Sequence, residues 1–286
     1  MLSRPLLTGF IVLILLALIP GGCTVVNATG VGMTQRDLPE QVDFIAPHAE
    51  LRLPETGEGP YGAVVFMHGC GGVRPLHDDY ADAALEAGYA VLIVDSLRPR
   101  GIGRAGALGL VCTGMRLWGR ERTADLYAAL EMLRGDERID ETRIALAGWS
   151  HGGWTILEAL ADAGQGRRPL ALDAQAGQSL DGVRAAILIY PYCSFPIHAE
   201  GEDLAAGTPV DAVLAGEDSI APAGACRDLF TAAQTAGAPV AWQVWEGLTH
   251  AFDEPRYTSS DPRMRYDEAA AERARRFLVA RLQARM

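Results

Sequence analysis

The stretch IALAGWSHGG, from Ile144 to Gly153, decides the fold. Its first half is an apolar run of strand character, and a helical pattern continues to Ala163. The turn between them, GWSHG, matches G-x-S-x-G, in which a strained bend exposes the serine hydroxyl at the end of a sheet. The glycines remove side-chain clashes, and the helix N-terminus adds positive potential. This pattern predicts that Ser150 is a nucleophile.

Outward from this turn, short apolar runs alternate with helical patterns. Strands are expected at 41–46, 49–53, 63–67, 89–94, 144–149, 185–190, 210–215 and 240–245, and helices at 80–87, 120–134, 153–163, 223–236 and 266–285. Such alternation predicts the α/β class, with a mostly parallel central sheet covered by helices on both faces. We expect one such domain over residues 41–286, after a flexible segment at 24–40.

A serine hydroxyl needs a general base, and in this arrangement an acid and then a histidine follow the serine along the chain. Apart from His151 in the serine turn itself, two histidines follow Ser150 along the chain. His250 follows an apolar strand and a glycine-containing loop, whereas His198 lies in an irregular loop before the expected acid. We therefore assign the base to His250.

The acid is expected just past the strand that precedes the histidine's strand. Asp218 has this position, in Gly216-Glu-Asp-Ser219 after the run 210–215. Its carboxylate would hold the imidazole tautomer and stabilise the imidazolium. Glu217 is the alternative, and Asp253 is a weaker one because it lies too close to His250 in sequence.

Two backbone amides are expected to stabilise the oxyanion. One is the amide of His151, and the other is that of Cys70 in the glycine-rich loop MHGCGG, from Met67 to Gly72. Glycines in that loop let the backbone approach a substrate. His68 is expected to brace the loop by hydrogen bonding rather than to bind a metal.

Together these residues resemble the dienelactone hydrolase family of α/β-hydrolases. The matching stretches are VVFMHGCGG (64–72), AGYAVLIVDSLRPRG (87–101), IALAGWSHGG (144–153), GEDSIAP (216–222) and GLTHAFD (247–253). The resemblance implies the α/β-hydrolase fold, and hydrolysis of a carboxylic ester or lactone without metal or organic cofactor. Two positions depart from the family: Ser150 stands where it has cysteine, and Gly69 stands where it has a glutamate. They favour a broader esterase role over the strict dienelactone substrate.

Two rival functions are a serine peptidase on the same fold and a non-catalytic envelope lipoprotein that retains the scaffold. Such peptidases usually carry a propeller or a large cap, and the sequence shows neither. The complete serine, acid, histidine and glycine-loop set argues against a non-catalytic scaffold.

Substrate-binding residues are expected at the same rim. Arg100, and less so Arg98, could bind a substrate carboxylate bidentately, although a structural arginine tying the loop to carbonyls is the stronger reading. Trp154 is expected in an acyl or leaving-group pocket. Further aromatic candidates are Trp118, Tyr192, Phe195 and Phe252.

The composition of the chain excludes several classes of partner and of chemistry. The net charge of −11 and the pI near 5.0 argue against nucleic acid, which requires a basic patch. The sequence contains no lysine, which excludes a P-loop lysine, a Schiff base and a Ser-x-x-Lys acyl transferase. The expected partner is a small-molecule ester or lactone.

The N-terminus has the pattern of a targeting segment. Arg4 precedes an apolar run from Leu6 to Ile19, which is shorter than the ~20 residues that span a bilayer. We expect an export or lipoprotein signal over residues 1–23, and a periplasmic or envelope location. Lipidation at Cys23 would attach the chain to a membrane; cleavage after Ala28 and a retained anchor are the alternatives.

Four cysteines remain when Cys23 is set aside, and an even number in an exported chain favours disulfides. In this fold, the strands that end at Met67 and Val94 are neighbours, so the cysteines after them reach the same rim. The same reasoning applies to the strands that end at 190 and 215. We therefore predict the pairs Cys70–Cys112 and Cys193–Cys226, with the first holding the long loop 96–119 onto the oxyanion loop.

Overall fold

The computed structural model describes residues 33–173, 179–256 and 261–286. Within them, a seven-stranded sheet contains β1 Ala49–Arg52, β2 Tyr61–Met67, β3 Ala90–Val94, β4 Ile139–Trp149, β5 Val183–Ile189, β6 Val210–Ala215 and β7 Val240–Trp245. The longer helices are α2 Leu38–Ile45, α3 Pro75–Glu86, α5 Gly119–Arg134, α6 His151–Gly164, α7 Ala223–Thr235 and α8 Glu268–Arg285. Short helical turns are η1 Ala46–His48, η2 Arg98–Arg100, α4 Arg104–Gly106, η3 Ala107–Val111 and η4 Gly201–Ala206.

The strand order is β1-β3-β2-β4-β5-β6-β7, and only β1 runs antiparallel to its neighbour. Met67 at the end of β2 pairs in register with Gly148 near the end of β4. Likewise, the end of β6 pairs with the end of β7. Because parallel strands end at one edge, the glycine-rich loop and the serine turn lie next to each other there. The expected α/β-hydrolase fold is confirmed.

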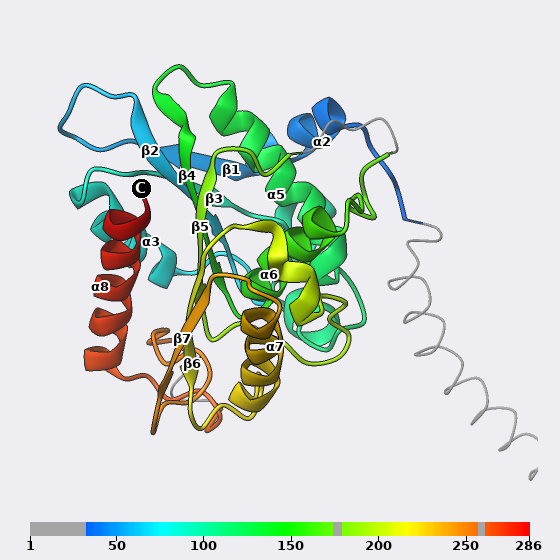
Figure 1. The fold of residues 1–286 in the computed structure, drawn as a ribbon, viewed down its shortest axis with the longest axis vertical. Helices are drawn as coiled ribbons and strands as arrows, with labels where there is room; N and C mark the ends of the chain where they lie inside the picture. The colour runs from blue at the N-terminus through cyan, green and yellow to red at the C-terminus, as the bar shows by residue number, and fades with distance from the viewer. Residues whose placement is uncertain (1–32, 174–178, 257–260) are drawn as a thin grey trace, which may run out of the picture.

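Helices cover both faces of the sheet, with α3 and α8 on one face and α2, α5, α6 and α7 on the other (Figure 1). The strands bury alternate residues against these two layers. In β2, Val65 packs toward the side of α5 and α6, whereas Phe66 packs toward the side of α3 and α8. Burial on both faces explains why the central strands are unbroken apolar runs in the sequence.

One expected strand is wrong. Residues 41–46 belong to helix α2 and its C-terminal cap, not to a strand. Asp37 caps this helix, and its carboxylate accepts a hydrogen bond from the Glu40 amide at 2.7 Å while Glu40 interacts with the Asp37 amide. This capping box is a sequence signal for a helix start that outweighs the alternation in the following residues. The fold also begins earlier than residue 41, because the Arg36 amide bonds to the Ala171 carbonyl.

Both predicted disulfides are confirmed. Cys70 is bonded to Cys112, and Cys193 is bonded to Cys226. The first bond ties the glycine-rich loop to the segment between β3 and α5. The apolar N-terminal run and Cys23 lie outside the described residues. Among the residues that are described, no helix has the length and apolar character needed to cross a membrane.

Candidate active site

Ser150 occupies a strained turn between β4 and α6. Its backbone φ is 50°, a left-handed conformation that is uncommon for a residue with a side chain. A Cβ atom on Gly148 would lie 2.7 Å from the backbone of Gly152, and one on Gly152 would overlap the carbonyl oxygen of Met67. The two glycines of the pentapeptide are therefore required for the turn to fit between β2 and β4. This bend places the serine side chain at the N-terminus of α6.

The structure brings Ser150, His250 and Asp218 together. The His250 Nε2 atom lies 2.9 Å from the Ser150 hydroxyl oxygen, and its Nδ1 atom lies 2.6 Å from a carboxylate oxygen of Asp218. The other Asp218 oxygen accepts the amides of Ile220 and Ala221 at 2.8 and 2.7 Å. Because a carboxylate can only accept, the Nδ1 atom carries a proton and the Nε2 atom is free to accept the serine proton.

The three alternative residues lie elsewhere. Glu217 points to the surface and pairs with Arg265 at 2.8 Å. The carboxylate of Asp253 is buried and accepts hydrogen bonds from the hydroxyls of Tyr80 and Tyr190, at 2.7 and 2.5 Å. Burial raises its pKa above the ordinary value. His198 contacts the Trp118 ring, with centroids 6.3 Å apart.

The glycine-rich loop lies directly against the serine turn. A Cβ atom on Gly69 would come within 3.6 Å of the Ser150 Cβ atom, and Cys70 lines the same cavity as Ser150. The amide of His151 is the first in α6, so by position it has no acceptor within the helix. The amides of Cys70 and His151 thus belong to the two backbone segments that flank the serine hydroxyl.

His68 is buried and braces this loop. Its Nε2 atom accepts the amide of Ser96 at 3.1 Å, so its Nδ1 atom carries the proton and donates to the Gly69 carbonyl at 2.6 Å. Burial, together with the nearby Arg122 charge, holds the pKa of this imidazole well below its usual value. A neutral bracing histidine agrees with the role expected from the sequence.

Two cavities meet at Ser150. One, of about 400 Å³, contains His250, Tyr190 and an apolar wall with Leu76 and Leu108. The other, of about 470 Å³, contains His151, the expected Trp154, and the further aromatic residues Trp118, Tyr192 and Phe195. Both cavities include Cys70. A molecule bound at the serine can therefore extend in two directions.

Two expected substrate contacts do not fit the structure. The guanidinium of Arg100 makes two hydrogen bonds to Asp125, at 2.9 and 3.0 Å, and a third to the Ser96 carbonyl. It lines neither cavity at Ser150; it ties η2 to α5, in the structural role that the sequence analysis favoured for it. Phe252 is fully buried between the sheet and α8, where it packs against Tyr190.

A buried carboxylate supports the aromatic cavity. One oxygen of Glu158 accepts the Trp154 indole N–H at 2.7 Å and the backbone amide of His198 at 2.8 Å. The other oxygen has no hydrogen-bond partner in the described part of the chain. Burial raises the pKa of this carboxyl to about 7. The folded protein therefore holds a proton on Glu158 at pH values where the unfolded chain has released it.

We expect Glu158→Gln to remove a pH-dependent loss of stability. A raised carboxyl pKa means that folding is favoured below the unfolded value of about 4.5, and that this contribution is lost as pH rises toward about 7. Glutamine keeps the acceptor oxygen but cannot ionise. Urea denaturation should show nearly equal stability at pH 4, and a variant more stable by roughly 1–3 kcal/mol at pH 8. The exposed Glu217→Gln is the control, and parallel pH profiles for wild type and Glu158→Gln would contradict the expectation.

Comparisons with known proteins agree with this architecture. The model of the dienelactone hydrolase family matches residues 169–284, which include Asp218 and His250. The model of the prolyl oligopeptidase family matches residues 79–166, which include Ser150. "Probable dipeptidyl-aminopeptidase B" of Grosmannia clavigera is 41% identical over 125 residues. That match covers 41% of this chain and 12% of the relative, so the chain spans only a small part of that protein's length.

Solved structures share the fold at low sequence identity. Esterase 2 of Thermogutta terrifontis, phosphonylated by cyclosarin, has a TM-score of 0.59 at 15% identity, covering 82% of this chain and 88% of that one. A dienelactone hydrolase of Anabaena variabilis has a TM-score of 0.55 at 18% identity, with coverage of 83% and 91%. Est1E of Butyrivibrio proteoclasticus, bound to ferulic acid, has a TM-score of 0.55 at 14% identity, with coverage of 82% and 95%.

The fold and these matches define the class of structure: the chain has the α/β-hydrolase fold, and two parts of it match hydrolase families. Within it, the resemblance to the dienelactone hydrolase family expected from the motifs is confirmed by the family match over residues 169–284. Both matching families are families of hydrolases, which supports the conclusion that this protein is an enzyme.

Proposed function

We propose that this protein hydrolyses carboxylic esters or lactones through an acyl intermediate on Ser150. The observation that carries the proposal is the continuous hydrogen-bonded series from Asp218 through His250 to the Ser150 hydroxyl. A serine hydroxyl is a weak nucleophile, and a base at 2.9 Å supplies the activation that it lacks. The serine is also accessible to ligands, because two cavities meet at its side chain.

The proposed reaction has two halves. The Ser150 oxygen attacks the ester carbonyl, and its proton passes to the Nε2 atom of His250. The amides of Cys70 and His151 donate to the oxyanion that forms. When the carbon–oxygen bond to the alcohol breaks, His250 gives its proton to that alcohol. Water then attacks the acyl-serine by the same route, and Asp218 stabilises the imidazolium in each half.

The two cavities suggest how an ester is oriented. The leaving alcohol must receive a proton from His250, so it belongs in the cavity that contains this residue. The acyl part then extends past His151 into the cavity that contains Trp118 and Trp154. An ester with sizeable groups on both sides of the carbonyl would fill both cavities.

A serine peptidase is the second candidate, because residues 79–166 match the prolyl oligopeptidase family and a dipeptidyl-aminopeptidase relative shares 41% identity. A panel of p-nitrophenyl esters of different acyl lengths, lactones and dipeptidyl p-nitroanilides separates the two. We expect turnover of esters or lactones, and no p-nitroanilide turnover above that of Ser150→Ala. The reverse pattern would replace the ester proposal with the peptidase. A protein that turns over none of these and reacts with no serine-directed probe would be a non-catalytic scaffold.

We also propose that the chain is exported to the periplasm or envelope, and that Cys23 carries a lipid. Disulfides favour an oxidising compartment, and the structure has two. If so, detergent should be needed to release the protein from the membrane fraction, and Cys23→Ala should abolish this requirement. Recovery in the cytoplasm with Met1 intact would contradict export.

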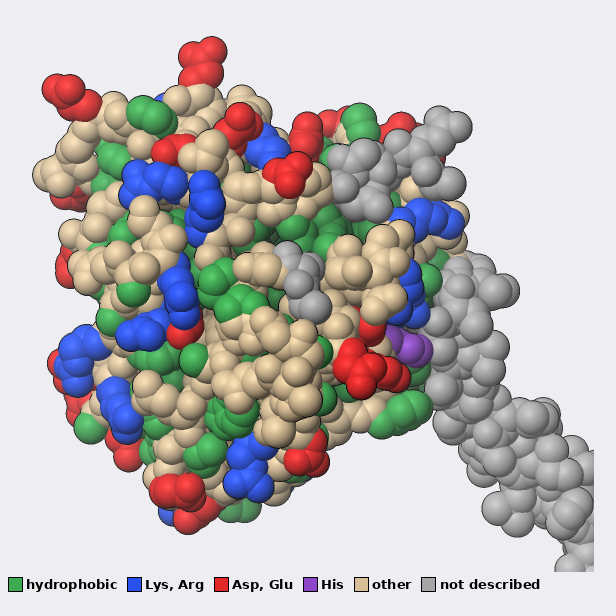
Figure 2. Space-filling model, viewed as in Figure 1, with side chains coloured by type: hydrophobic (Ala, Val, Ile, Leu, Met, Phe, Trp, Pro, Cys, Tyr) green, Lys and Arg blue, Asp and Glu red, His purple; other side chains and the backbone are tan. Residues whose placement is uncertain are grey.

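The proposed partner is a small molecule and not nucleic acid. The net charge is −11, and arginine side chains are interspersed with acidic ones on the face shown in Figure 2.

A further inference from the structure

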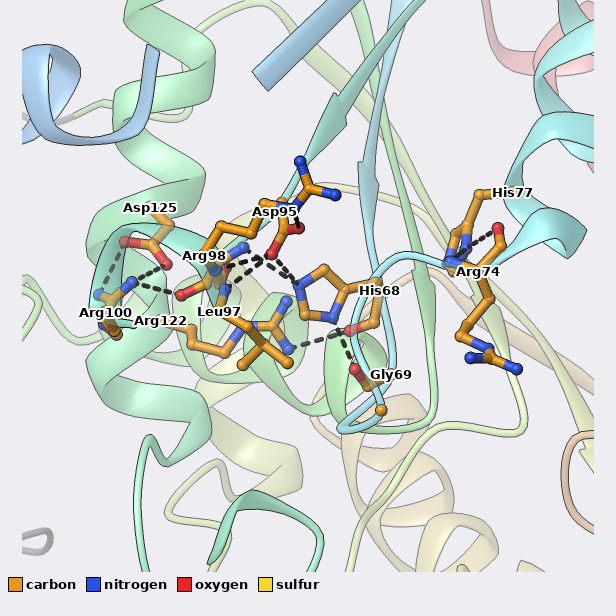
Figure 3. Close-up of polar contacts among 12 residues, drawn as sticks. His68, Gly69, Arg74, His77, Asp95, Leu97, Arg98, Arg100, Arg122 and Asp125 are labelled. Atoms are coloured by element: carbon orange, nitrogen blue, oxygen red, sulfur yellow. Dashed lines mark hydrogen bonds and ion pairs between the residues drawn. The ribbon is translucent and has the colours of Figure 1, made fainter. Parts of the chain in front are cut away.

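Arg122 is a fully buried arginine behind the serine turn, in the first part of α5. Its Nη1 atom donates to the backbone carbonyl of His68 at 2.9 Å (Figure 3). The same atom lies 2.9 Å from the Nδ1 atom of His151. One guanidinium nitrogen therefore joins the glycine-rich loop to the start of α6, the two segments that carry the proposed oxyanion amides.

The contact with His151 fixes that imidazole. A guanidinium has no acceptor, so the Nδ1 atom of His151 must accept and the neutral ring carries its proton on Nε2. Burial, reinforced by the Arg122 charge, lowers the pKa of His151 to about 3. The ring is thus a neutral support for the residue whose backbone amide is proposed to donate to the oxyanion, and not a competing base.

Arg122 also lacks a direct counter-ion. In the described part of the chain, no carboxylate lies within ion-pair distance of its guanidinium, and its Nε and Nη2 atoms have no hydrogen-bond partner. Asp125, the acid whose charge acts most on Arg122, is occupied by Arg100 and Gln41. Burial lowers the pKa of Arg122 to about 10, which still leaves it charged at neutral pH.

An unpaired buried charge is unfavourable for folding, and its presence needs an explanation. The charge would be complemented when negative charge develops on a substrate carbonyl oxygen beside the Cys70 and His151 amides. Preorganised charges of this kind stabilise a transition state without stabilising a neutral substrate.

We propose that Arg122 is the positioning residue of the oxyanion site: it holds the Cys70 and His151 segments in place and supplies a buried positive charge behind them. The inference rests on the proposed esterase function. It predicts that Arg122 acts on the charged intermediate and not on binding of the neutral ester.

The test compares Arg122→Gln and Arg122→Lys with Arg100→Gln, which removes a part-buried arginine that also contacts α5. The measurements are kcat and KM on one ester, the thermal midpoint, and the inhibition constant of a phenylboronic acid. In the inhibited complex, the Ser150 oxygen bonds to boron, its proton passes to His250, and boron becomes a tetrahedral anion. The inhibition constant therefore measures how well the site stabilises a negative charge that a neutral ester lacks.

We expect Arg122→Gln to lower kcat about 10²-fold, with a comparable weakening of boronate inhibition and KM within about threefold of wild type. Arg122→Lys, which keeps the charge, should recover part of the kcat and remains informative if the glutamine variant does not fold. Arg100→Gln should lose thermal stability but keep kcat and boronate inhibition within about threefold.

Wild-type kcat and boronate inhibition in Arg122→Gln, or no recovery in a folded Arg122→Lys relative to Arg122→Gln, would overturn the inference and leave the proposed function intact. The inference would also be overturned if Arg122→Gln and Arg100→Gln lost kcat equally and the losses could be explained by the lowering of their thermal midpoints. A wild-type protein that neither hydrolyses esters nor binds the boronate would instead remove the proposed function, and the inference with it.

Discussion

Ser150→Ala is expected to lower ester turnover by ~10⁴–10⁶-fold while the protein remains folded. Alanine keeps the Cβ atom of the strained turn, and the glycines that fit between β2 and β4 are unchanged. Only the hydroxyl that lies 2.9 Å from His250 is lost. Residual turnover would come from the oxyanion amides acting on bound substrate with water as nucleophile.

The matched control for this substitution is Ser219→Ala, because Ser219 also lines the aromatic cavity but lies outside the hydrogen-bonded series. Initial rates on a p-nitrophenyl ester, with circular dichroism to verify folding, measure both variants. We expect Ser219→Ala to keep turnover within about tenfold of wild type. If Ser150→Ala also stayed within that range, the nucleophile assignment would be wrong.

His250→Ala is expected to lower ester turnover nearly as much as Ser150→Ala, since the serine would lose the base that lies at hydrogen-bond distance. The control is His198→Ala, which removes the other histidine that follows the serine turn. His198 packs near Trp118 and its backbone amide bonds to Glu158, so its loss should have a mild effect. An inactive His198→Ala with an active His250→Ala would reverse the assignment of the base.

The acid completes this prediction. Asp218→Asn should lower ester turnover less than Ser150→Ala does, because the imidazole stays in place as a base in a less favourable tautomer. Glu217→Gln, at the exposed neighbouring position, should be tolerated. Rates measured on the same ester check both variants, and a larger loss in Glu217→Gln than in Asp218→Asn would contradict the assignment.

The sheet could be predicted because burial on both faces makes its strands unbroken apolar runs. The run at 63–67 lies within β2 and the run at 89–94 contains β3, and all of these residues are buried. The segment 41–46 was misassigned because a short amphipathic helix can also show apolar alternation over a few residues. There, the capping box at Asp37 and Glu40 was the more informative signal.

Strand order was also sufficient to pair the cysteines, because neighbouring strands bring their following loops to one edge. The long-range partners of charged side chains could not be obtained in this way. Arg100 was a candidate for substrate binding because its loop is at the correct rim, yet Asp125 on a different element binds its guanidinium. Arg122 was missed, although a charged residue on the buried side of a helix that also buries Leu126 and Ala129 is a detectable signal.

The most direct measurement of catalysis through Ser150 is covalent labelling with a fluorophosphonate, followed by peptide mass spectrometry. The serine oxygen displaces fluoride from phosphorus, and the proton passes to His250. We predict one adduct, on the peptide that contains Ser150, which is absent from Ser150→Ala and greatly slowed in His250→Ala. A wild-type protein that remains unlabelled, or an adduct that persists in Ser150→Ala, would contradict the assignment.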